Sequence, residues 1–304
     1  MVIGGGSLAY AAYQAPEMVI GQALGSTFAQ ANPSFTLDLS SDNTDLGGTA
    51  TLDVATAPIG SKLSLKLAGK YMGSDIGATL NVLAAKTGNY YLNLEKFDSL
   101  AKYLLSTGMV SQMEIDAYSK LLKGAWISVS KTDLTNASID NPCVTEKFNN
   151  PTYLKTLQSK MGLILRDNNF IVAKNELAGI NGDRVFEMTI SADKLKKFIM
   201  ALKTTPYIAD FKSCNPTFEL DMTTVNAINQ KEIDAWFSDN GVTWTLQANG
   251  FSHNLTKMSL DIKKGTTSGH LTYVPTGDRS STVKMPTKFV TFSEFFNQLL
   301  MYPY

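Results

Sequence analysis

The stretch Leu63-Ser64-Leu65-Lys66-Leu67 decides the fold, because leucine alternates with polar residues throughout it. Successive side chains of a β-strand point to opposite faces of a sheet, so the three leucines share one face and Ser64 and Lys66 share the other. The stretch therefore predicts a strand that buries one face only.

The same alternation extends in both directions along the chain. Phe35, Leu37 and Leu39 alternate with polar residues before this strand, and residues 76–82 continue the pattern after it. Turn-forming residues separate the strands, at 45–48, 58–60, 70–74 and 87–89. Short strands joined by such turns are typical of an antiparallel meander, which we expect over residues 34–94.

The rest of the chain mixes helical and strand patterns. Apolar residues at helical spacing predict helices over residues 15–32, 97–105, 113–122, 153–161, 192–202 and 292–301. Strand patterns occur at 125–129, 170–172, 184–190, 217–222, 232–237, 243–248, 257–262 and 269–274. Turns at 181–182, 239–241 and 263–265 predict hairpins, and Asn181-Gly182 is the strongest of these signals. The chain is therefore expected to be an α+β protein with a largely antiparallel sheet.

Length and charge limit the classes of function. A chain of 304 residues can form one large domain, which we place at residues 16–304. It carries 27 basic and 27 acidic residues, so nucleic acid is not an expected partner. The longest basic run, Lys194, Lys196 and Lys197, is interpreted as the solvated face of a helix.

Residues 1–15 contain no Lys, Arg, Asp or Glu. A membrane-spanning helix needs about 20 apolar residues, and a secretory signal has a basic region before its apolar core. We interpret residues 1–15 as the truncated tail of a signal anchor or transmembrane segment that would contact the membrane. An ordinary apolar strand or helix is the alternative.

The only cysteines are Cys143 and Cys214, and each lies next to turn-forming residues. In an exported protein such a pair favours one disulfide that closes a long loop. Two unrelated reduced thiols remain the alternative. Metal binding is not expected, because a zinc site needs about four ligands and the chain otherwise offers only His253 and His270.

No residue pattern indicates catalysis. Neither histidine accompanies a Gly-x-Ser-x-Gly motif, and no phosphate-binding glycine loop follows a strand. Acidic residues such as Glu187 and Asp234 alternate with apolar neighbours, so they are expected to face solvent. We therefore predict a protein that is not an enzyme and has no cofactor.

A family resemblance lies mainly in the second half. Residues 177–190 form an Asn-Gly hairpin that leads into a helix at 191–202. Beyond them follow a predicted strand with a central Trp236, a turn at 238–241 and a return strand that ends at His253. This order resembles the LolA-like and LppX/LprG-like lipoprotein carriers over roughly residues 15–290.

The resemblance implies a curved antiparallel β half-barrel with helices covering its concave face and an apolar cavity for acyl chains. It departs from the family in two respects, because the lipobox cysteine is absent and the chain is longer than many members. An uncleaved N-terminal helix would replace the lipid anchor.

The function expected from this resemblance is binding or transport of a lipid or another hydrophobic ligand, by a monomer. Its place would be extracytoplasmic, anchored to the outer face of the cytoplasmic membrane or secreted. The alternation of the strands selects the candidate lining residues Leu63, Leu65, Leu67, Leu80, Val82, Phe186, Met188, Ile190, Phe218, Leu220 and Met222.

Two alternatives remain open. The same apolar residues would equally fill an ordinary core, and an inverted register would move the whole set to the opposite face. The second function considered is a non-catalytic structural or protein-interaction β domain of the cell envelope. A cavity distinguishes the two functions, because a carrier needs several hundred Å³ of apolar space.

Overall fold

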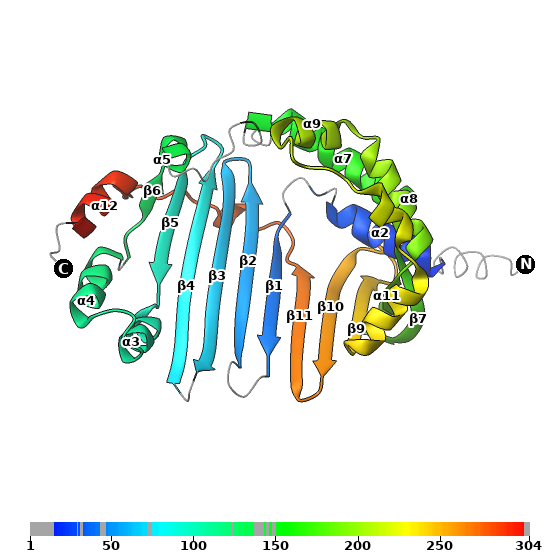
Figure 1. The fold of residues 1–304 in the computed structure, drawn as a ribbon, viewed down its shortest axis with the longest axis horizontal. Coiled ribbons are helices and arrows are strands. Elements are labelled where there is room, and N and C mark those ends of the chain that lie inside the picture. The colour runs from blue at the N-terminus through cyan, green and yellow to red at the C-terminus, as the bar shows by residue number, and fades with distance from the viewer. Residues whose placement is uncertain are drawn as a thin grey trace, which may run out of the picture. The chain divides into compact units, whose positions relative to one another are not determined.

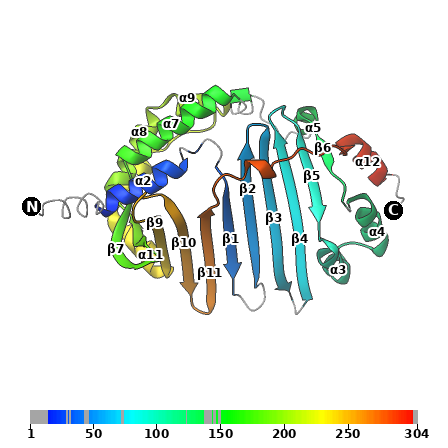
Figure 2. The same cartoon turned by 180° about the vertical axis from the view of Figure 1, so that it is seen from behind.

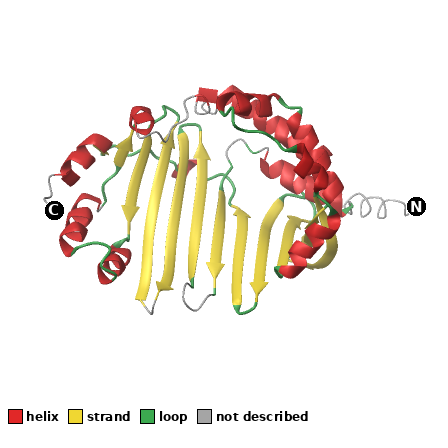
Figure 3. Ribbon diagram, viewed as in Figure 1, coloured by secondary structure: helices red, strands yellow, loops and turns green. Residues whose placement is uncertain are grey.

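The computed structural model describes residues 15–28, 30, 33–42, 47–71, 74–122, 124–136, 143, 146–147 and 150–300. The chain divides into two compact units. The helical unit comprises residues 1–31, 146–264 and 272–275, and the sheet unit comprises residues 32–145, 265–271 and 276–304. Helices and strands occur in both (Figure 3), so the predicted α+β class is confirmed. That residues 16–304 form a single domain stays a prediction.

The sheet unit is built on the predicted meander (Figure 1). Its strands are β1 (Phe35–Ser41), β2 (Gly48–Ala57), β3 (Gly60–Tyr71), β4 (Ser74–Ala85), β5 (Tyr90–Glu95), β6 (Ile127–Val129) and β12 (Val290–Thr291). The hydrogen-bonded order is β12-β6-β5-β4-β3-β2-β1. Neighbours from β1 to β6 are antiparallel, whereas β12 pairs with β6 in parallel. The sheet is therefore open and largely antiparallel, as expected, and the parallel pair of β12 and β6 makes it mixed.

The helices described in the sheet unit are short: α3 (Asp98–Ser106), α4 (Gln112–Leu122), α5 (Lys131–Asn136) and α12 (Phe292–Leu300). Side chains cap the starts of α4, α5 and α12, whereas the residue before α3 makes no side-chain cap hydrogen bond. Before α4, the Ser111 hydroxyl accepts from the Glu114 amide, and the Glu114 carboxylate accepts from the Ser111 amide. Thr291 and Glu294 make the same reciprocal pair at α12. Such capping boxes satisfy amide groups that have no partner inside the helix.

A C-terminal segment, residues 276–289, crosses one face of this sheet (Figure 2). This face carries Ser64, Asn81 and Leu83, and we call it the polar face. It includes the 3-10 helix η1 (Ser280–Thr282). Val283 is buried against Ala55, Ala57 and Leu83, and Arg279 lies 3.6 Å from the carboxylate of Asp53. This crossing brings the segment to β6 in the parallel direction, which explains why the sheet is mixed.

The helical unit combines antiparallel strands with most of the helices that the structure describes. Its elements are α2 (Pro16–Phe28), α7 (Pro151–Asp167), β7 (Ile171–Ile180), β8 (Asp183–Ile190), α8 (Ala192–Lys203), α9 (Pro206–Cys214), α10 (Met222–Ala227), α11 (Gln230–Asp239), β9 (Val242–Asn249) and β10 (Leu255–Lys264). The strands β7 to β10 pair antiparallel in chain order, and the hairpin predicted at Asn181-Gly182 joins β7 to β8. The strand β11 (Thr267–Pro275) follows the turn predicted at 263–265.

The core of the helical unit forms between α2 and the sheet. Val19 and Ile20 of α2 are fully buried, together with Phe186 of β8 and Leu246 of β9. Met188 is also part of this cluster. Burial of a large apolar side chain contributes about 1.5–3 kcal/mol, so this contact between α2 and the sheet is a main source of the unit's stability.

Two of the predicted strands were wrong. Residues 217–221 form no strand, and Met222 begins α10, where the Asp221 carboxylate accepts from the Thr223 amide at 2.8 Å. Residues 232–237 belong to α11, whose N-cap Asn229 accepts from the Glu232 amide at 3.0 Å. These caps stabilise the first turns of helices, so local hydrogen bonds outweigh the alternating pattern.

The error at α11 changes two further predictions. The strand with a central Trp236, which carried part of the family resemblance, is a helix on which the indole is 53% exposed. The turn at 239–241 links this helix to β9 and makes no hairpin. Gly241 has a positive φ of 57°, and a Cβ there would lie 2.1 Å from the Lys263 carbonyl oxygen, so glycine is required at this helix end.

The predicted disulfide is confirmed. Cys143 and Cys214 are both disulfide-bonded, and because the chain has no other cysteine, the bond joins them to each other. Disulfides persist in oxidising compartments, so the bond indicates an extracytoplasmic environment.

The signal-anchor prediction for residues 1–15 lies, apart from Ala15, outside the described residues. Across the part of the chain that the structure describes, no helix combines the length and apolar character that crossing a membrane requires.

Reduction of this disulfide should destabilise the protein. A closed loop of this size restricts the unfolded chain, and the expected loss in free energy of unfolding is about 4 kcal/mol. Urea denaturation with and without dithiothreitol measures it. A variant carrying both Cys143→Ser and Cys214→Ser is the control, because reductant should not change its stability. Equal stability of oxidised and reduced wild type would contradict the prediction.

An ion pair with a hydrogen-bonded tyrosine links α9 to α7 within the helical unit. The Lys147 ammonium lies 2.6 Å from one Asp210 oxygen, and the Tyr153 hydroxyl donates to the other at 3.1 Å. The hydrogen bond from Lys147 lowers the pKa of Asp210. Burial and the Asp210 carboxylate raise the pKa of Tyr153 to about 12. The Tyr153 and Tyr207 rings also make an edge contact, with centroids 5.4 Å apart.

Removal of the Asp210 charge should lower stability in a pH-dependent way. A carboxyl whose pKa is lowered by folding contributes above its ordinary value of 3.8, and the contribution disappears as pH falls through the folded pKa. Asp210→Asn should therefore cost less than about 1 kcal/mol near neutral pH, since both partners are partly exposed, and nothing in strong acid. Chemical denaturation over a pH series measures this, with Lys147→Met as the matched variant. A pH-independent loss would refute the assignment.

Candidate functional site

One face of the sheet unit is formed by aliphatic side chains in register. We name it the leucine face, and its cross-strand rows on β1 to β4 are Phe35-Val54-Leu63-Val82, Leu37-Leu52-Leu65-Leu80 and Leu39-Ala50-Leu67-Ala78. Five of the predicted lining residues, Leu63, Leu65, Leu67, Leu80 and Val82, therefore share one continuous surface. Cross-strand neighbours on one face lie about 5 Å apart, so the rows form an unbroken apolar area.

The leucine face is only partly covered. Leu39 and Leu67 are 50% and 45% exposed, whereas Ala78 is buried beneath Phe97 and Ala101 at α3. The remaining members of the rows are half-buried. A half-exposed aliphatic sheet face is uncommon in a soluble protein, and large exposed apolar areas mark binding surfaces.

The opposite face is polar but better covered. Ser64, Asn81 and Asn93 are all buried there. The Asn81 amide donates to the Asn93 side-chain oxygen at 3.3 Å, and the Asn93 amide donates to the Ala125 carbonyl at 2.9 Å. These hydrogen bonds compensate the loss of hydration on burial.

A pocket of about 330 Å³ lies at one end of the leucine face. It forms because small residues, Gly48, Ala50 and Gly69, stand in register between larger ones on β2 and β3. Its lining residues are Leu39, Ser41, Gly47, Gly48, Thr49, Ala50, Leu67, Ala68, Gly69, Lys70, Ile76, Gly77, Ala78 and Leu100. The size falls within the range of small-molecule sites, and the lining is predominantly apolar.

The glycine pair that opens the pocket is fixed by the backbone. A Cβ on Gly48 would lie 3.0 Å from the Ala68 carbonyl oxygen, and one on Gly69 would lie 2.9 Å from the Gly47 carbonyl oxygen. A larger residue at either position would therefore push the strands apart. Among the three small residues, only Ala50 offers a position where the pocket can be filled without this clash.

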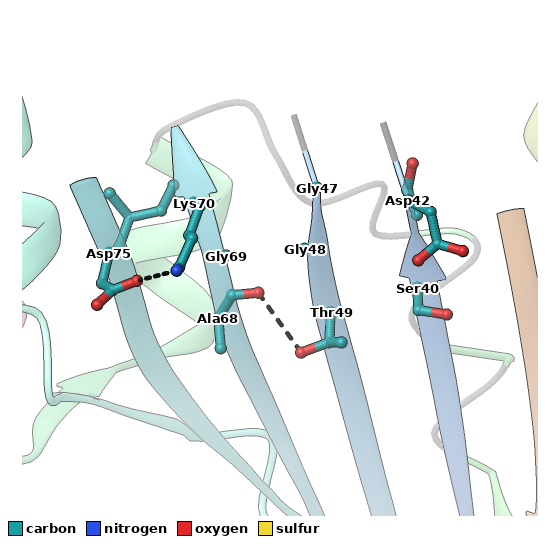
Figure 4. A pocket seen from close by; sticks show the side chains of 11 residues that line it. Ser40, Asp42, Gly47, Gly48, Thr49, Ala68, Gly69, Lys70 and Asp75 are labelled. Carbon is teal, nitrogen blue, oxygen red and sulfur yellow. Dashed lines mark hydrogen bonds and ion pairs between the residues drawn. The ribbon is translucent and has the colours of Figure 1, made fainter. Parts of the chain in front are cut away.

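An open hollow of about 720 Å³ adjoins the pocket and shares Gly48, Gly69 and Lys70 with it. Figure 4 shows the polar groups in its lining, among them Ser40 and Asp42. The Lys70 ammonium lies 4.0 Å from the Asp75 carboxylate, and both side chains are well exposed. The Thr49 hydroxyl donates to the Ala68 carbonyl at 3.4 Å. The site thus joins an apolar floor to a hydrated rim, which suits an amphiphilic molecule.

The other predicted lining residues lie elsewhere. Phe186 and Met188 are buried in the packed core beneath α2, and Ile190 is half-buried at the end of β8. Phe218, Leu220 and Met222 are not on a strand, so the alternation that selected them does not apply. Phe218 instead packs its ring against Phe211 of α9, with centroids 4.9 Å apart.

One of the two histidines, His253, is held in place by packing and a hydrogen-bond contact. His253 is buried with a positive φ of 53°, and its Nδ1 lies 2.8 Å from the Gln22 side-chain oxygen on α2. This contact gives the imidazole a structural position against the helix. Among the described residues, no three His, Cys, Asp or Glu side chains are grouped as metal ligands.

Comparison of the chain with protein-family models and with curated proteins found no match. The LolA-like resemblance therefore stays a prediction, and the interpretation of the site rests on its geometry.

Truncation of a core residue and of a leucine-face residue should have different effects on stability. Met188→Ala should cost about 2–5 kcal/mol, because it leaves a cavity under α2. Leu67→Ala should cost less than about 1 kcal/mol, because that side chain is largely hydrated already. Urea denaturation of both variants checks this difference. A comparable loss for Leu67→Ala would mean that the leucine face is tightly packed in solution.

Proposed function

We propose that the protein binds a lipid or another hydrophobic ligand on the leucine face, with an alkyl chain in the pocket at Gly48, Ala50 and Gly69. The main observation that supports this proposal is that rows of incompletely buried leucines lead into an apolar pocket of about 330 Å³. Each methylene that leaves water for such a surface contributes about 0.8 kcal/mol. A short alkyl segment therefore supplies useful affinity without specific polar contacts.

The binding proposed here is non-catalytic and needs no cofactor. The hydrated rim at Lys70 and Asp75 would face the polar end of the ligand, while its apolar part contacts Leu39 and Leu67. The finer architecture that we propose is the curved half-barrel whose concave face is covered by helices, as in the LolA-like and LppX/LprG-like carriers. Such a cover would shield the bound chain from water.

The proposed location is outside the cytoplasmic membrane. The disulfide between Cys143 and Cys214 supports an oxidising compartment. We propose further that the monomer is secreted, or is anchored to the outer face of the membrane through residues 1–15. A carrier placed there could exchange lipid with the membrane, and nucleic acid is not a proposed partner.

Native mass spectrometry combined with uptake of a fluorescent fatty acid tests the proposal. The wild-type chain should carry or take up one acyl ligand. Ala50→Phe should weaken uptake at least about tenfold, because the aromatic ring would occupy the pocket that the chain needs. The matched control is Lys66→Phe, which places the same ring on the opposite face of the adjacent strand, at an exposed position. It should bind like wild type.

Two results would count against the proposal. A bare mass with no uptake would favour the alternative of a non-catalytic structural or protein-interaction domain. Uptake that both variants reduce equally would place the ligand elsewhere on the molecule. The melting temperature of each variant separates loss of binding from loss of folding.

A further inference from the structure

A second pocket lies inside the helical unit, where α2 meets the end of α7 and the start of α8. Its volume is about 410 Å³. The residues that line it are Glu17, Met18, Gly21, Gln22, Arg166, Asp167, Asn168, Asn169, Lys194 and Lys197. It shares none of these with the leucine-face pocket and is predominantly polar in residue type, so a different chemistry is expected.

Asn169 supplies a hydrogen-bond donor that has no acceptor. Its side-chain oxygen accepts from the Ile171 amide at 3.1 Å, which fixes the orientation of the carboxamide. The side-chain nitrogen is buried and has no hydrogen-bond partner. It lies 3.9 Å from the position that a Cβ on Gly21 would occupy, so it is held against α2. A buried donor without an acceptor destabilises the folded protein, and a ligand oxygen that accepts from it would remove this penalty.

Two lysines add positive charge to the same pocket. Lys194 and Lys197 are three positions apart on α8, so they lie on the same face of the helix. Neither ammonium makes an ion pair or hydrogen bond with any residue that the structure describes. Lys196, between them, does not line the pocket. The sequence predicted that all three lysines form a solvated face, whereas in the structure Lys194 and Lys197 line this pocket and Lys196 does not.

The acidic residues of the pocket balance only part of this charge. The Asp167 carboxylate accepts from the Arg166 guanidinium at 2.9 Å, so these two neutralise each other. Glu17 is the remaining carboxylate in the lining, and it is exposed at the start of α2. The lining therefore holds two ammonium groups and one amide donor against one unpaired, hydrated carboxylate. This excess of positive charge and donors favours binding of an anion.

We propose that this pocket binds a phosphate-type oxyanion, with Lys194 and Lys197 contacting the charge and the Asn169 amide donating to one oxygen. A phosphate group offers three oxygens and a compact negative charge to the three donors of the pocket. A carboxylate offers only two oxygens, so it matches these donors less well. The oxyanion could belong to free phosphate or to the headgroup of a phospholipid. The site does not depend on the leucine face, since no lining residue is common to both.

Isothermal titration of the full chain with inorganic phosphate at low ionic strength tests the proposal, alongside flotation with vesicles that contain phosphatidic acid. Lys194→Gln and Lys197→Gln should each weaken binding about tenfold, because each removes a charge-assisted hydrogen bond. Asn169→Asp should weaken it at least as much, because it replaces the donor by a carboxylate of the same shape. Lys196→Gln is the matched control and should bind within about twofold of wild type.

Each outcome decides a point. Binding of inorganic phosphate that needs Lys194 and Asn169, without vesicle binding, identifies free phosphate. Vesicle binding with the same dependence, and no response to phosphate, identifies a lipid headgroup. Binding of neither probe, or equal losses for Lys194→Gln and Lys196→Gln, would overturn the proposal. Unchanged melting temperatures confirm that the variants fold, and fatty-acid uptake by the same variants should stay at the wild-type level.

Discussion

The sheet unit depends on the register of its meander. The two-residue period of side chains places every leucine of β3 opposite an aliphatic residue of β2 and β4. A shift by one residue would exchange the two faces, and the buried pair Asn81 and Asn93 would lose its hydrogen bonds. The polar contacts on one side therefore hold the apolar surface on the other.

The two units use apolar residues in different ways. In the helical unit, α2 covers Phe186 and Met188 and leaves a conventional packed core. In the sheet unit, the C-terminal segment covers the polar face, and the leucine face is left with Leu39 and Leu67 half in water. The packed core and the proposed ligand surface therefore lie on different parts of the molecule, so the carrier that we propose would release its cargo without unfolding.

Strands are predicted correctly from the sequence where apolar and polar residues alternate over a long stretch. The prediction fails where helix-capping hydrogen bonds, which the alternation does not reveal, determine the secondary structure. Leu63 to Leu67 follow the two-residue period over a full strand, and the structure agrees. At α11, the signal that was missed is Asn229 followed by Ile233, Trp236 and Phe237, a cap with helical spacing.

Other features cannot be read from one segment at all. The pocket exists because Gly48 stands opposite Gly69, and this pairing depends on the loop between two strands. Alternation likewise shows that Phe186 points inward, but only the position of α2 shows that a helix fills the space there. Whether an inward-facing strand residue lines a cavity or belongs to a packed core therefore depends on the side chains of the helix or strand that lies over it.

The crossing of the polar face by residues 276–289 has a consequence for the order of assembly. Strands β2 to β5 leave the ribosome long before the segment that packs on Ala55, Ala57 and Leu83. At ordinary elongation rates, roughly 10–40 s separate the two events. During that interval, the C-terminal segment with η1 is not yet present to cover the meander. The newly made strands would thus be open to aggregation, and a holding chaperone would be most useful in that interval.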